Sequence, residues 1–147
     1  MNSRRAAREW ALKALYAREL SGDALDWVIK TLQPSNPQSS HFKFALDLVE
    51  RTDQMKERLD LLIRKHAEKW ELERIAALDR IILRIAICEL LFFDDIPPKV
   101  TINEAIEIAK KYSTAKSDKF INGILDAVLR KDVTGQKSAV QSNRGGI

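Results

Sequence analysis

Three arginines near the start of the chain have the side chains and the spacing to bind an anion. If this segment is helical, Arg4, Arg5 and Arg8 fall within an arc of roughly 100°, beside the apolar face of the helix. Their guanidinium groups can then face one anionic surface, and phosphate contacts of this kind give salt-sensitive affinity with little base selection. The alternative is a solvated basic face with an Arg5–Glu9 ion pair.

A second basic region lies near the end of the chain and combines lysines with aromatic rings: Lys110, Lys111, Lys116, Lys119, Tyr112 and Phe120. Single-stranded RNA is often bound by stacking its bases on aromatic rings beside cations. Phe120 also fits the apolar spacing of a helix, so a place in the core is the alternative.

Catalysis and metal binding have no comparable residue set. His41, His66 and Cys88 are far apart and lack the spacing of a zinc site. The scattered glycines form neither a phosphate-binding loop nor a dinucleotide fingerprint. We therefore expect no enzyme activity, no cofactor and no metal. Glu73 and Asp79 are acidic residues that can meet a basic protein partner, although ion pairs with neighbouring arginines are the simpler alternative.

Apolar residues recur at intervals of three and four along almost the whole chain, which predicts an all-α fold. The expected helices cover residues 3–20, 24–32, 41–68, 78–93, 101–112 and 117–131, with a loop at 33–40. The most apolar of them, 78–93, should be central. Residues 1–131 are expected to form one domain, and the polar, aperiodic residues 132–147 a disordered tail.

Two local patterns make sharper predictions about these helices. Pro97 and Pro98 should end the central helix, after which Thr101 and Glu104 fit a capping box that starts the next helix. The Asn122-Gly123 pair lies inside a continuing apolar pattern, so we expect a helical glycine that lets another helix approach closely.

Composition excludes several classes of protein. The chain has 147 residues, 45% of them hydrophobic and 31% charged, with a net charge of +4 and no continuous apolar run behind its N-terminal arginines. This is typical of a soluble globular domain, which we expect to be cytoplasmic and without a membrane span. Its mildly basic balance suits an anionic partner.

Four segments together resemble the NusB transcription antitermination factors of bacteria: RRAARE with ALY, LDR with ILRIA and EL, IP with INEAIE, and KFINGILD. They occur in the family's order across residues 3–131. The resemblance implies two small helix bundles packed together, and no catalysed reaction. It also implies joint binding of boxA RNA with the ribosomal small-subunit protein that acts as Nus factor E, within an antitermination complex of RNA polymerase.

The resemblance also assigns roles to individual residues. It implies RNA contacts by Arg4, Arg5, Arg8, Tyr16, Lys119, Phe120 and Asn122, and protein-partner contacts by Glu73 and Asp79. Three positions depart from the common pattern. Ala6 replaces another arginine of some relatives, Lys116 replaces an acidic residue, and Cys88 replaces a common tyrosine.

Two other interpretations fit part of these observations. A ribosomal RNA methyltransferase can carry a similar helical domain, but it needs a Rossmann-like domain of which these 147 residues show no sign. A purely protein-binding adaptor would leave the arginines as solvated surface and would show no salt-sensitive RNA binding. The helical face that meets the partner could also pair with a second copy, giving a homodimer.

Overall fold

The computed structural model describes residues 1–67, 71–114 and 116–133, and every regular element in these ranges is helical. The elements are α1 Arg4–Ser21, α2 Leu25–Thr31, α3 Ser40–Gln54, α4 Lys56–Ala67, a 3₁₀ turn Leu72–Arg74, α5 Ala77–Phe92, α6 Pro98–Tyr112, α7 Ser117–Val128 and a π-helical turn Leu129–Val133. The predicted all-α class is confirmed. No helix in the described ranges is long and apolar enough to cross a membrane.

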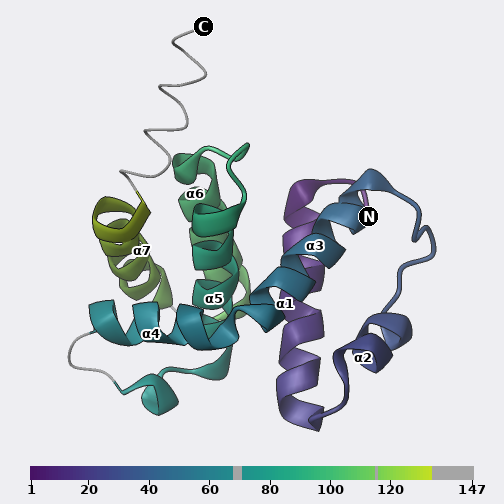
Figure 1. The fold of residues 1–147 in the computed structure, drawn as a ribbon, viewed down its shortest axis with the longest axis horizontal. Helices are drawn as coiled ribbons and strands as arrows, with labels where there is room; N and C mark the ends of the chain where they lie inside the picture. The colour runs from purple at the N-terminus through teal and green to yellow at the C-terminus, as the bar shows by residue number, and fades with distance from the viewer. Residues whose placement is uncertain (68–70, 115, 134–147) are drawn as a thin grey trace, which may run out of the picture.

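The helices form two small bundles that share one core. α1, α2 and α3 pack together on one side, and α4, α6 and α7 surround α5 on the other (Figure 1). Both α1 and α3 also contact α5. Every residue of α5 from Ile81 to Leu91 is buried, which confirms it as the central helix.

Partly buried ion pairs join the two bundles. The Arg84 guanidinium of α5 donates to Asp60 of α4 at 2.7 Å and to Glu19 of α1 at 3.2 Å. Arg80 donates to the same Glu19 at 3.1 Å and also to the carbonyl oxygen of Ile75 at 2.9 Å. Arg84 is 9% exposed, and a charge buried to this extent is tolerated only when it is paired in this way.

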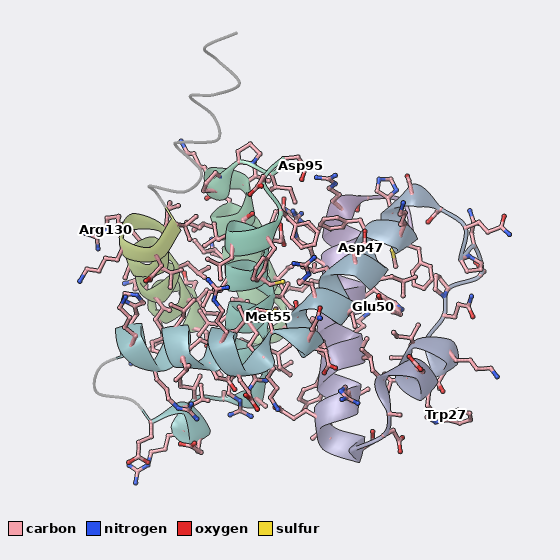
Figure 2. The ribbon with its side chains drawn as sticks, in the orientation of Figure 1. Trp27, Asp47, Glu50, Met55, Asp95 and Arg130 are labelled. Atoms are coloured by element: carbon pink, nitrogen blue, oxygen red, sulfur yellow. The ribbon has the colours of Figure 1, made fainter. Side chains whose placement is uncertain are left out.

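The single long helix predicted for 41–68 is wrong, because the chain turns at Met55 between α3 and α4 (Figure 2). The Met55 amide still donates to the Arg51 carbonyl at 2.9 Å, so α3 ends in an ordinary last turn. α3 packs mainly on α1 and also contacts α5, whereas α4 packs on α5 and α7. Packing against different helices therefore overrides a continuous apolar period.

The predicted capping box at Thr101 and Glu104 is not formed. α6 begins at Pro98, whose fixed φ and missing amide hydrogen suit the first position of a helix. The Thr101 hydroxyl donates to Glu89 at 3.2 Å, and the Glu104 carboxylate accepts from Arg5 at 2.7 Å. Contacts with other helices thus use the two side chains that the local motif would have used.

Gly123 is helical, as predicted, but the expected close approach of another helix is wrong. The residue is exposed in the middle of α7, and a Cβ built on it would meet no heavy atom within 4 Å. Nothing in the described part of the chain requires a glycine at this position.

The folded part extends two residues beyond the predicted boundary at residue 131. Val133 is buried with 1% of its surface exposed, and the Asp132 carboxylate lies 2.8 Å from Lys65 Nζ and 2.7 Å from His66 Nε2. Asp132 therefore ties the end of the last helical turn to α4. The remainder of the predicted tail, 134–147, lies outside the described residues.

Candidate nucleic-acid interface

The first turn of α1 presents two arginines to solvent. The Ser3 hydroxyl accepts a hydrogen bond from the Ala6 amide at 3.0 Å and so caps the helix immediately before Arg4 and Arg5. Their side chains are 48% and 53% exposed. The free amides of a helix N-terminus carry partial positive charge, so two guanidinium groups at this end make an anion-binding surface.

Arg4 lies between an aromatic ring and a carboxylate. Its guanidinium carbon is 4.7 Å from the centre of the Phe44 ring, and its Nη2 is 3.6 Å from Asp95. Asp95 belongs to the loop after α5, at the end of the molecule where α1 begins (Figure 2). The ring of Phe44 supports the guanidinium from one side and leaves it accessible.

Arg5 forms a two-point ion pair with α6. Its Nε and Nη2 donate to the two carboxylate oxygens of Glu104 at 2.7 and 3.1 Å. The hydrogen bond and the charge of Glu104 raise the pKa of Arg5, so the group stays protonated. The Glu104 side chain is 21% exposed and that of Arg5 is 53% exposed, so this ion pair between α1 and α6 lies at the surface.

Arg8 does not face the same surface. Its side chain is 4% exposed, and both of its donors lie 2.7 Å from the oxygens of Glu89, which is 1% exposed. Around the helix axis, Arg8 does lie between Arg4 and Arg5, as the spacing predicts. It is one turn further along α1, however, and there this side of the helix packs against α5. The expectation of three guanidinium groups on one surface is therefore corrected to two.

Charged side chains continue from α1 onto α6. Lys111 Nζ donates to Glu9 at 2.6 Å, and Lys110 lies 3.5 Å from Glu107. Burial raises the pKa of Glu9, but its hydrogen bonds with Lys111 and Tyr112 outweigh that effect and leave the pKa below its ordinary value. Arg5 and these four charged residues line a hollow of about 330 Å³ between the helices.

The predicted RNA residues of α7 form a separate surface. Lys119 and Asn122 are exposed one turn apart, whereas Phe120 is partly buried and packs against the core. Phe120 also lines a hollow of about 360 Å³ together with Arg74, Ile75, Ala76, Asp79, Thr114, Lys116 and Ser117. Tyr16 of α1 is partly buried against the core as well. The structure thus brings Arg4 and Arg5 together at the start of α1, whereas the predicted RNA residues of α7 lie on a different part of the surface.

The two predicted partner residues differ in exposure. Glu73 is exposed and lies 3.7 Å from Arg64. Asp79 is 7% exposed and accepts hydrogen bonds from the hydroxyls of Ser113 and Ser117, so its carboxylate organises the loop between α6 and α7. Only Glu73 presents its carboxylate to the surface.

The sequence did not predict the acidic residues that pair with the arginines: Asp95, Glu104 and Glu89. A signal was available for Glu89 alone, because a single carboxylate inside an apolar run requires a buried cation. Among the described residues, no group of three or more His, Cys, Asp and Glu side chains is placed to hold a metal ion.

Comparison with known proteins identifies the family. A family model described as the NusB family matches residues 5–130. The transcription antitermination protein NusB of Salinibacter ruber is 44% identical over 147 residues, which cover 99% of this chain and 91% of the relative. NusB of Thermodesulfovibrio yellowstonii is also 44% identical, over 92% of this chain and 97% of its own.

Solved structures agree in fold. T. maritima NusB superposes with a TM-score of 0.87 at 36% identity, covering 95% of this chain and 99% of its own. A crystal structure of the antitermination factors NusB and NusE with double-stranded RNA matches with a TM-score of 0.79 at 27% identity, covering 88% of this chain and 98% of its own. Family match, sequence identity and fold together show that this chain belongs to the NusB family of transcription antitermination proteins.

Proposed function

We propose that this protein binds boxA-type RNA together with the ribosomal protein NusE and thereby supports transcription through terminators. The observation that carries the proposal is the pair of exposed arginines, Arg4 and Arg5, at the positive end of α1 in a member of the NusB family. A related structure is described as NusB and NusE in complex with RNA.

In this proposal the two surfaces have different tasks. Arg4 and Arg5 bind backbone phosphates, which supplies affinity without base selection. Lys119, Phe120 and Asn122 contact the RNA from α7, where an aromatic ring and an amide can select bases. Arg8 acts indirectly, because its buried pair with Glu89 anchors the first turns of α1 on α5.

Glu73 is the exposed carboxylate that we assign to the protein partner, and Asp79 shapes the neighbouring loop. The complex of protein, NusE and RNA then joins RNA polymerase in the cytoplasm. A homodimer is the competing use of the partner surface. Sedimentation velocity of the protein with and without NusE separates these two assemblies by their mass.

The test is fluorescence anisotropy of a labelled boxA RNA and a scrambled RNA of equal composition, titrated with the protein alone and with NusE across a salt series. We expect a preference for boxA that NusE strengthens, and affinity that falls as salt rises. Equal binding of both RNAs that NusE does not change would refute the proposal and favour an adaptor that binds only proteins.

A further inference from the structure

Each of four exposed cations on the α1–α6 side of the molecule already has a carboxylate partner. The pairs are Arg4 with Asp95, Arg5 with Glu104, Lys110 with Glu107 and Lys111 with Glu9. These four positive charges thus face four negative charges, which offsets part of the positive charge of the candidate RNA surface in the free protein.

Among these pairs, Arg5 with Glu104 has the best geometry. Of the four pairs, it alone has two hydrogen bonds, at 2.7 and 3.1 Å. Glu104 belongs to α6, which packs on α5. The other three are single contacts, and two of those are longer than 3.4 Å. A two-point carboxylate contact uses the same donors that a phosphate would use.

We propose that Glu104 competes with RNA for Arg5, so that a backbone phosphate must displace the Glu104 carboxylate before Arg5 can bind it. Glu104 then lowers the affinity for every RNA by the same factor, whatever its sequence. It keeps non-specific binding weak and leaves selection to base contacts and to the partner. This inference rests on the proposed function, because it assumes that Arg5 binds phosphate.

Replacing Glu104 with glutamine tests the competition directly. Glutamine has nearly the same shape, but it carries no charge to hold Arg5 or to repel a phosphate. We expect Glu104→Gln to tighten the binding of boxA and of scrambled RNA alike, by about three- to tenfold at low salt, and the gain to shrink as salt rises.

Two further variants separate competition for Arg5 from a change in net charge. Glu107→Gln removes an equal charge from the same helix but leaves the Arg5–Glu104 pair intact, so we expect a smaller gain. In an Arg5→Gln background, Glu104→Gln should lose most of its effect. Glu107→Gln should keep most of its own, because Glu107 forms no hydrogen bond with Arg5 and acts on it only through its charge. This double-mutant cycle isolates the coupling between Arg5 and Glu104.

Several results would overturn the inference. It is wrong if Glu104→Gln weakens RNA binding or leaves it unchanged, since Glu104 would then orient Arg5 or take no part. It is also wrong if Glu104→Gln and Glu107→Gln increase the RNA affinity equally and if both increases persist in the Arg5→Gln background. Wild-type protein that binds neither RNA would refute the proposed function, and the inference with it. Circular dichroism and thermal unfolding of each variant check that the fold is retained.

Discussion

At the scale of single residues, burial decides which charges can act. Arg8 and Glu89 are sealed between α1 and α5, whereas Arg4 and Arg5, one turn earlier, reach solvent. Identical side chains in one short motif therefore have different surroundings. The sequence identified the motif, but it could not show which arginine meets the core, because that depends on where α5 and α6 lie.

Removing one partner of the buried pair should be costly. Arg8→Met leaves the Glu89 carboxylate buried without its cation, so we expect a loss of about 3–5 kcal/mol in the free energy of unfolding, measured by urea denaturation. In Arg8→Met with Glu89→Leu both charges are gone, and most of the loss should be recovered. A double variant as unstable as the single one would contradict this account.

The thiol of Cys88 should be unreactive in the folded protein. Burial raises its pKa to about 11, and the thiolate fraction near neutral pH is therefore very small. We expect a thiol-specific reagent at pH 8 to modify Cys88 only after denaturant is added. Rapid modification of the native protein, followed by absorbance, would show that the site opens.

Asp132 should make the last helical turn sensitive to acid. Burial raises the pKa of this carboxyl, but Lys65 and His66 outweigh burial and lower it below the ordinary value. A lowered pKa means that Asp132 stabilises the fold above its unfolded pKa of about 4, and that this contribution disappears as the pH falls through the lower folded value. In Asp132→Asn, stability measured by thermal unfolding should therefore depend less on pH below about pH 4 than in the wild type. An unchanged pH dependence would mean that the contact is absent in solution.

At the scale of helices, the sequence predicted the helical segments of α1 to α7, but not the break between α3 and α4 nor all of the helix ends. Apolar periodicity identified α1, α5 and α7 because each buries one stripe or nearly its whole surface. It failed at Met55, and the capping motif failed at Thr101, because both outcomes depend on contacts with other helices. Local capping motifs are weak when a stronger partner such as Arg5 lies across the interface.

The exposed glycine of α7 allows a prediction at this scale. Gly123→Ala adds a methyl group to open space in a helix interior, so we expect it to stabilise the fold by about 0.5–1 kcal/mol in urea denaturation. If RNA or a protein partner packs on this point, the same variant should weaken that complex while stabilising the free protein. A destabilised variant would mean that the helix is not formed there as described.

At the scale of the whole molecule, two bundles are joined by charges as well as by apolar packing. A partly buried network links α1 to α4 and α5 through Glu19, Asp60, Arg80 and Arg84. The Arg8–Glu89 pair adds a fully buried link between α1 and α5. We expect one cooperative unfolding transition, since neither bundle can separate without exposing these groups. Two transitions in calorimetry would contradict that expectation.

The all-α class and the central helix could be predicted, because they depend on periodicity. The pairing of Arg4 with Asp95, of Arg5 with Glu104 and of Asp79 with Ser117 could not. These residues are between 38 and 99 positions apart in the sequence, and only the packed bundles bring them together.

The central claim is that the first turn of α1 is an RNA-binding surface. The most direct measurement compares boxA affinity at fixed salt, with NusE present, for the wild type, Arg5→Ala and the control Lys30→Ala. Lys30 is an exposed cation of α2, which lies near the opposite end of α1 (Figure 1). We predict a loss of about tenfold for Arg5→Ala and almost none for Lys30→Ala. Equal affinities for all three proteins would contradict the claim.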